Sequence, residues 1–306
     1  TIVRVSDAYG KSGSVVYVLR DQEVSSTIPV NKNITIEAEA GTTVVLKRSQ
    51  SFTGDFMFKV QSGANFNVSR TAGGKVIIDG ENIASAYGAV KVENGRFYLN
   101  SNGVIRNNNS TSNGAAVYTS AGGNSQIHIY GTIKGNHTDV DGGAICSNGF
   151  TYVYASSEIS NNSANGNAGA IYNYGGGVAS ISGGNHSGNT AVGNGGFFWA
   201  DGKTTISGGT ITGNSAANGG GIYGENSPNT VARILELTGG TITGNTATSG
   251  DDIYTRTNHV SFRGNITVGD IYIPSGVSLI VNGALTGSVG FSYGGEPAAD
   301  GTTVFT

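Results

Sequence analysis

Short apolar runs alternate with glycine, asparagine and serine along most of the chain. The phrase ISGGTITGNSAANGGGIYG (206–224) returns as LTGGTITGNTATSGDDIYT (237–255). In both copies, residues that favour β-strands (Ile, Thr, Tyr) are followed by residues that favour turns. The pattern predicts short strands joined by tight turns, and the recurrence predicts a repeat architecture.

Each repeat is marked by an asparagine that follows an apolar residue and two small or polar residues. The phrase reads IRNN, IKGN, ISNN, HSGN, ITGN, ITGN and FRGN, and its asparagines lie 28, 26, 27, 25, 31 and 20 residues apart. A second element such as GGAIC or GGGIY follows most of them, and a further apolar patch precedes most of them. Three short strands in about 25 residues, each bounded by Gly or Asn, are typical of a parallel β-helix.

We therefore predict an all-β fold, a right-handed parallel β-helix built as a three-strand solenoid of roughly ten to twelve coils. A single domain should cover residues 1–306, with an N-terminal cap at 1–24, solenoid coils at 25–275 and irregular C-terminal coils at 276–306. Asn and Gly are expected in left-handed or tight turns between strands. One column of side chains should form a ladder of amides bonded from rung to rung, and its members are Asn108, Asn136, Asn162, Asn189, Asn214 and Asn245.

Alternation along the strand after each asparagine assigns its side chains to two faces. The inner position is apolar in every copy: Val117, Ile145, Ile171, Phe198, Ile222 and Ile253. The preceding position holds Ala116, Ala144, Ala170, Phe197, Gly221 and Asp252, and the aspartate indicates the solvent side. The predicted outer row is then Tyr118, Cys146, Tyr172, Trp199, Tyr223 and Tyr254. Stacked rings can simply stabilise rung pairing, which is the simpler interpretation, or they can form a platform for sugar rings or a partner protein.

The ligand-binding residues predicted from this row are Tyr172, Trp199, Tyr223 and Tyr254 with Asp252, and Trp199 should be the anchor. Aromatic faces stack on sugars, and amide or carboxylate groups bind hydroxyls. The expected partner is a surface glycan, or a protein on a host or neighbouring cell.

Composition limits the other functions. Charged residues make up 12% of the chain and the net charge is −3, so no attraction to nucleic acid is expected. Cys146 is the one cysteine, which allows no internal disulfide. No apolar run approaches the ~18 residues of a membrane span, so this segment should not insert into a bilayer. Thr1 is not a natural start, so we expect a monomeric fragment of a longer chain.

Catalytic chemistry finds little support in the residue pattern. The GDD at 250–252 resembles the paired carboxylates of polygalacturonase-type hydrolases, but the companion motifs of that family are missing, so Asp251 and Asp252 are interpreted as a repeat variant. Asp139 and Asp141 should solvate a turn, and a calcium ion there is left open. The histidines His128, His137, His186 and His259 have no metal-ligand spacing, and His186 replaces a core Ile. We expect no catalytic residue, metal or cofactor.

The tetrapeptides GGAI (142–145) and FRGN (262–265), with GNTA and NNSAN phrases around them, resemble the β-helix repeats of bacterial and archaeal surface proteins, including polymorphic outer-membrane proteins and adhesin-like repeats. The resemblance covers about residues 86 to 275, and a tail like GALTG…TVFT accompanies it. It implies an extracellular or cell-surface adhesin. A polysaccharide lyase or hydrolase and a passive surface stalk are the alternatives.

Overall fold

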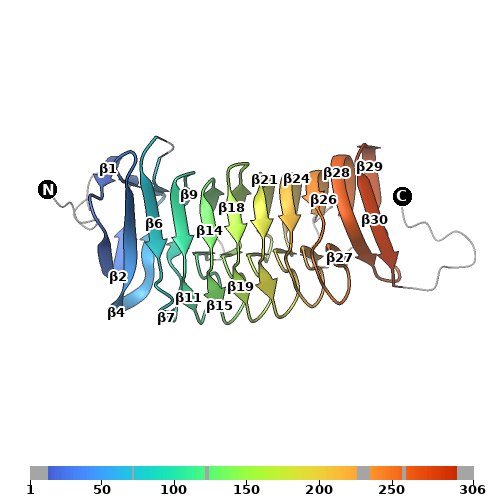
Figure 1. Cartoon of the computed structure of the whole chain (residues 1–306), viewed down its shortest axis with the longest axis horizontal. Coiled ribbons are helices and arrows are strands. Elements are labelled where there is room, and N and C mark those ends of the chain that lie inside the picture. Colours follow the sequence, from blue (N-terminus) through green and yellow to red (C-terminus); the bar gives the residue numbers. More distant parts are fainter. Residues whose placement is uncertain (1–12, 71, 121–123, 226–234, 257–259, 295–306) are drawn as a thin grey trace, which may run out of the picture.

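The computed structural model describes residues 13–294 apart from residue 71 and the segments 121–123, 226–234 and 257–259. Its architecture is a parallel β-helix, which confirms the predicted fold class. Its turns are stacked into a rod, with β1 (Ser14–Tyr17) and β30 (Ser288–Tyr293) at opposite ends (Figure 1). His259, the first half of the expected cap (residues 1–12) and the TVFT end of the tail lie outside the described residues. Among the described residues there is no helix long and apolar enough to cross a membrane.

Three columns of strands run along the rod, and the described strands pair only in parallel. The first column contains β1 (Ser14–Tyr17), β3 (Ile34–Glu37), β5 (Asn65–Val68), β9 (Arg96–Leu99), β13 (Gln126–Ile129), β17 (Phe150–Val153), the beginnings of β21 (Val178–Ser187), β24 (Lys203–Thr212), β26 (Leu235–Ile242) and β28 (Val260–Ile273), and β29 (Ile280–Leu285).

The second column follows at the next face. It contains the beginnings of β2 (Gln22–Val30) and β4 (Thr43–Val60), then β6 (Lys75–Asp79), β10 (Gly103–Arg106), β14 (Thr132–Lys134), β18 (Glu158–Ser160), later parts of β21, β24, β26 and β28, and the beginning of β30 (Ser288–Tyr293). Because β1 pairs with β3 and β2 with β4, the described solenoid already begins at Ser14, before the expected start at residue 25.

The third column completes each turn. It contains the ends of β2 and β4, then β8 (Val90–Val92), β12 (Val117–Thr119), β16 (Ile145–Ser147), β20 (Ile171–Asn173), β23 (Phe198–Ala200), β25 (Ile222–Gly224), β27 (Ile253–Thr255) and the ends of β28 and β30. A small second sheet lines the turn before this column, formed by β7 (Ala84–Ser85), β11 (Asn109–Ser110), β15 (His137–Thr138), β19 (Ser163–Ala164) and β22 (Thr190–Ala191).

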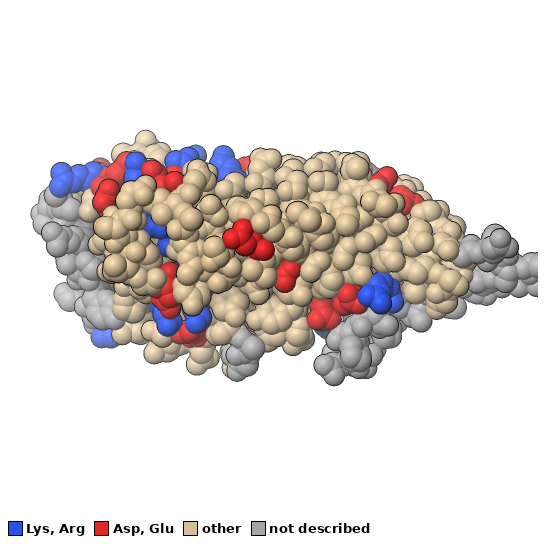
Figure 2. Space-filling view, turned by 90° about the horizontal axis from the view of Figure 1, so that it is seen from below, with Lys and Arg blue, Asp and Glu red and all other residues tan. Residues whose placement is uncertain are grey.

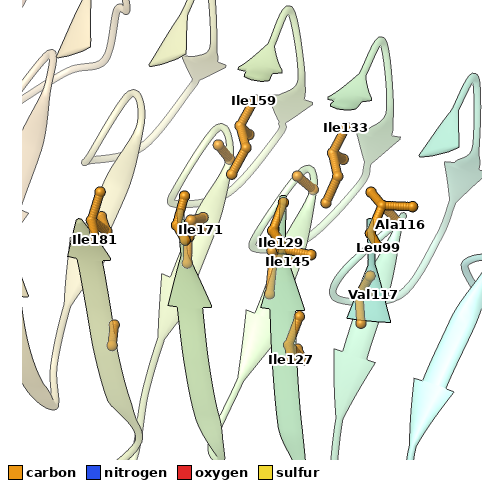
Figure 3. Close-up of a cluster of buried hydrophobic side chains, with 14 of the residues drawn as sticks. Leu99, Ala116, Val117, Ile127, Ile129, Ile133, Ile145, Ile159, Ile171 and Ile181 are labelled. Carbon is orange, nitrogen blue, oxygen red and sulfur yellow. The ribbon is translucent and has the colours of Figure 1, made fainter. Parts of the chain in front are cut away.

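The core is one continuous column of apolar side chains inside the coils (Figure 3). The inner position predicted in the third column is fully buried in all six coils, from Val117 to Ile253. The first column contributes alternating residues such as Ile127 and Ile129, and the second contributes Ile133 and Ile159. Each coil buries only a few side chains, so the stacking of neighbouring coils supplies most of the buried area.

Candidate functional site

The predicted asparagine column exists, and it is buried. Asn108, Asn136, Asn162, Asn189, Asn214 and Asn245 lie one above another. In each step the Nδ2 group of one asparagine donates to the Oδ1 atom of the next at 2.8–2.9 Å. The backbone N–H donates to the same Oδ1 atom at 2.9–3.1 Å. Every link therefore runs from the N-terminal rung to the C-terminal rung.

The left-handed residue of this turn precedes the ladder asparagine. Asn107 and Asn161 have φ of 53°, and Gly135, Gly188, Gly213 and Gly244 have φ between 62° and 68°. The sequence predicts Asn and Gly in such conformations. In the structure, two neighbouring residues share the work, one making the turn and the other forming the ladder. The residue before the ladder position makes the sharp turn. The ladder asparagine then bonds backwards, as when Asn136 Nδ2 donates to the Lys134 carbonyl at 3.2 Å.

Asp252 ends this ladder and is not on the solvent side, so that part of the sequence interpretation is wrong. Its side chain is 3% exposed, and Oδ1 accepts from the N–H and Nδ2 groups of Asn245 at 3.1 and 2.8 Å. Oδ2 accepts from the Asp270 N–H at 2.9 Å. A carboxylate thus takes the place of the next asparagine, as the acceptor that the last rung needs.

The error arises from the local backbone. The third-column strands begin at Val117, Ile145, Ile171, Phe198, Ile222 and Ile253, so the residue before each strand belongs to the turn. Strict alternation does not extend into a turn. The whole preceding position is accordingly buried: Ala116, Ala144, Ala170, Phe197, Gly221 and Asp252.

A second polar column, which was not predicted, lies at the other end of the same turn. The Asp141 N–H donates to Asn113 Oδ1 at 3.1 Å, and the Asn167 N–H donates to Asp141 Oδ1 at 2.7 Å. The Asn194 N–H donates to Asn167 Oδ1 at 3.0 Å, and Asn218 Nδ2 to Asn194 Oδ1 at 2.7 Å. These links run from the C-terminal rung to the N-terminal rung, opposite to the first ladder.

The remaining acidic and histidine candidates have structural partners. Asp139 accepts from Asn165 Nδ2 at 3.0 Å and lies 3.4 Å from His137 Nε2, and Asp251 Oδ1 accepts from the Ala247 N–H at 2.8 Å. Asp141 belongs to the second ladder, so both acidic side chains of the DVDGG turn accept hydrogen bonds from the protein itself. In the described ranges, no three or more His, Cys, Asp or Glu side chains gather as they would around a metal ion.

The predicted aromatic row forms, but its exposure was overestimated. The rings of Tyr172, Trp199, Tyr223 and Tyr254 follow one another on the outer face of the third column, with centroids 4.5–5.6 Å apart, and Tyr272 extends the row. Trp199 is only 8% exposed and Tyr223 only 4%, whereas Tyr172 and Tyr254 are half-buried. The row is a small second hydrophobic cluster outside the main core.

Ring orientation further limits the row as a sugar platform. Neighbouring planes are inclined by 6° to 43°, so each interior ring turns its faces toward adjacent rungs and only its edge toward solvent. Sugars stack on ring faces rather than on edges. Trp199, enclosed between Tyr172 and Tyr223, therefore has no free face to serve as the predicted anchor.

Cys146 interrupts the predicted aromatic row, and Tyr174, a residue that the repeat did not indicate, bridges the interruption. Tyr174 stacks on Tyr172 with centroids 5.7 Å apart and forms a side-chain hydrogen bond with Tyr118. Cys146 is fully buried, and burial together with Asp141 raises the pKa of its thiol. A buried thiol that stays protonated is a poor nucleophile, so Cys146 is a packed residue rather than a reactive one.

A second aromatic cluster lies on the outer face of the first column. Tyr98, His128 and Tyr152 stack with centroids 4.4 and 4.8 Å apart, and Tyr130 stacks on Tyr154 at 3.9 Å. His128 Nδ1 lies 3.0 Å from the Tyr154 hydroxyl. Burial, followed by the charge of Arg96, lowers the pKa of His128 to about 4. The signal was present in the sequence as aromatic residues at paired positions of successive coils.

A hollow of about 250 Å³ opens beside the N-terminal end of the third-column row. It is lined by Phe56, Tyr87, Lys91, Ser112, Asn113 and Tyr118. The Phe56 ring lies 5.2 Å from Tyr87 and 6.0 Å from Tyr118, and the Lys91 ammonium lies 5.9 Å from the Phe56 centroid. Of these six residues only Tyr118 belongs to the predicted outer row, and none is among the predicted ligand-binding residues.

A step between two coils creates this hollow. Ser85 pairs with Ser110 and Val90 with Val117. Residues 86–89 connect β7 to β8, whereas residues 111–116 connect β11 to β12 in the next coil. The turn of the N-terminal coil is therefore the shorter one. The Arg48 guanidinium fixes the short turn, because it donates to Ser85 Oγ at 2.9 Å and to the Gly88 carbonyl at 2.7 Å. The hollow therefore lies where asparagine-ladder coils begin.

His186 is the hydrogen-bonded core histidine that the sequence indicated. It is fully buried, its Nε2 atom lies 3.1 Å from the Gly183 carbonyl oxygen, and its ring stacks on Phe197 at 4.6 Å. Burial lowers its pKa from 6.5 to about 4. In register, it lies between Ile159 and Ile211.

This burial predicts acid sensitivity. Between pH 6.5 and about 4 the unfolded chain binds a proton at His186 that the folded chain does not. The free energy of unfolding should therefore fall as pH drops through this range, by about 3 kcal/mol in total. Urea titrations across the range should show this loss in the wild type and a loss smaller by about 3 kcal/mol in His186→Ile. His137→Gln, on the surface, is the control, and an unchanged pH slope in His186→Ile would contradict the assignment.

Comparisons with known protein families, with curated proteins and with solved structures gave no match. The class of protein is consequently defined by the fold itself. The chain is a parallel β-helix repeat protein, held together by a buried amide ladder and a continuous apolar core.

Proposed function

We propose that the chain is a rigid, non-enzymatic, ligand-binding solenoid of the adhesin type, displayed outside the cell and directed at neutral glycans. The observation that carries the proposal is the chemistry of its surface. Among Lys and Arg, residues 107–202 contain only Lys134, and they are rich in Asn, Ser, Thr and Tyr. Figure 2 shows most of the Lys and Arg side chains near the N-terminal end and a largely uncharged surface beyond it.

Amide, hydroxyl and aromatic groups on a fixed scaffold suit sugar recognition. Hydroxyl-rich ligands need several convergent donors and acceptors, and carbon–hydrogen faces pack on aromatic rings. A stacked solenoid holds such groups in register, so little ordering is required on binding. The resemblance of GGAI and FRGN to surface-protein repeats supports the same interpretation.

A polysaccharide lyase or hydrolase is less well supported. Inverting hydrolysis needs two carboxyl groups with a water between them. The Asp252 carboxylate accepts hydrogen bonds from Asn245 and from the Asp270 N–H. Asp251 Oδ1 accepts from the Ala247 N–H. These contacts favour a structural role for the GDD sequence.

The test is a glycan array probed with the labelled chain, together with an activity screen on polygalacturonate and neutral plant polysaccharides. We expect binding to neutral glycans and no product formation. Turnover that disappears in Asp251→Asn would favour the enzyme. Absence of binding to every glycan would overturn the proposal in favour of a passive stalk.

A further inference from the structure

The hollow at the start of the asparagine-ladder coils combines free aromatic surface with polar groups. Tyr87 is 41% exposed, unlike the enclosed rings of Trp199 and Tyr223. Phe56 is buried beneath Tyr87 and Tyr118, and it supports both rings at 5.2 and 6.0 Å. The hollow is thus an aromatic-walled depression on a fixed base.

Polar groups line the rest of the hollow. Asn113 is the N-terminal member of the second ladder, and its Oδ1 atom accepts from the Asp141 N–H. That contact holds the side chain in place at the edge of the hollow, beside Ser112. Ser112 contributes its hydroxyl, while its backbone carbonyl accepts from Thr138 Oγ1 at 2.6 Å and keeps the turn fixed.

The charge of the hollow is balanced. Lys91 Nζ lies 2.5 Å from Glu93 Oε1, and Lys59 Nζ lies 3.3 Å from Asp55 Oδ2 and 3.6 Å from Glu93 Oε2. Two ammonium groups therefore face two carboxylates. An anionic ligand would have to compete with Glu93 for Lys91, whereas a neutral hydroxyl can share the ammonium as a hydrogen-bond acceptor.

We infer that this hollow is a binding site for one uncharged pyranose ring, at the end of or within a longer glycan. This inference rests on the proposed function and locates it. The volume of about 250 Å³ is below the roughly 300–1,000 Å³ of sites for drug-sized ligands, which favours a single ring. The carbon–hydrogen face of the sugar packs on Tyr87 and Tyr118, and its hydroxyls meet Asn113, Ser112 and Lys91.

The experiment is an NMR titration of the whole chain with methyl β-glucopyranoside, methyl β-galactopyranoside and methyl α-mannopyranoside, with glucuronate as the charged counterpart. At least one neutral glycoside should bind and should show saturation transfer to its ring protons. Tyr87→Ala should weaken that binding at least tenfold. Ser112→Leu, which fills the hollow and leaves the backbone contacts of residue 112, should abolish it.

Tyr17→Ala is the matched control, because Tyr17 is 47% exposed and lies in β1, away from the hollow. Its binding should equal that of the wild type. Three outcomes would each overturn the assignment. A neutral glycoside could still bind both Tyr87→Ala and Ser112→Leu, or no neutral glycoside could bind the wild type. The third outcome is that glucuronate binds more tightly than the neutral glycosides. If the glycan array is positive while the hollow variants still bind the same glycans, the site fails but the proposed function stands.

Discussion

Asn162→Ala should lower the free energy of unfolding by about 3–5 kcal/mol, because it removes an interior rung of the buried ladder. Asn162 Oδ1 accepts from the N–H and Nδ2 groups of Asn136, and Asn162 Nδ2 donates to Asn189 Oδ1 and to the Ile133 carbonyl. The substitution leaves the buried Asn136 N–H without its acceptor. An orphaned buried group costs about 1–3 kcal/mol in addition to the lost bonds.

Asn108→Ala is the matched control at the N-terminal end of the same ladder. Asn108 Oδ1 has no hydrogen-bond donor among the described residues, so its removal orphans no donor. The loss should be about 1–2 kcal/mol. Urea unfolding of both variants, followed by circular dichroism, measures the difference. Equal losses at the two positions would show that the asparagines act independently rather than as a ladder.

Trp199→Ala should cost about 3–5 kcal/mol, as for other large buried aromatic residues. Trp199 is almost enclosed by Tyr172 and Tyr223, with centroids 5.6 and 4.5 Å away. Its removal would break the outer cluster in the middle of the rod. Trp199→Phe keeps a ring in the stack and should lose much less.

Because Trp199 is the one tryptophan of the chain, its burial can also be measured without mutation. Native fluorescence should resist quenching by acrylamide and become accessible in urea. If Trp199→Ala leaves the urea midpoint unchanged, or if native emission is freely quenched, the Trp199 ring is exposed. The aromatic row would then again be a candidate ligand-binding platform.

Features that recur in every coil because the coils stack could be predicted from the sequence. Ile145 and Ile171 occupy the predicted inner positions, and Asn136 and Asn162 occupy the predicted column, because the same constraint acts on every rung. A residue that recurs at one position in many coils reports that shared environment.

The features that occur once were missed or misinterpreted. Asp252 stands where other coils carry small or aromatic residues, and its role as the end of the ladder depends on Asn245 and Asp270, which the repeat cannot reveal. Tyr174 lies outside the predicted row, yet it bridges the interruption of that row at Cys146. The hollow depends on one shortened turn and on Arg48 from a coil without the asparagine phrase.

The two oppositely directed amide ladders make the coil an interchangeable module. Each interior rung presents the same acceptors on one side and the same donors on the other, from Asn136 through Asn214. Duplicating residues 137–162 in place would add a coil whose every ladder group meets a partner, while Asp252 would still terminate the first ladder. The rod can thus lengthen or shorten in steps of about 4.8 Å, so gene duplication alone could adjust how far the ends stand apart.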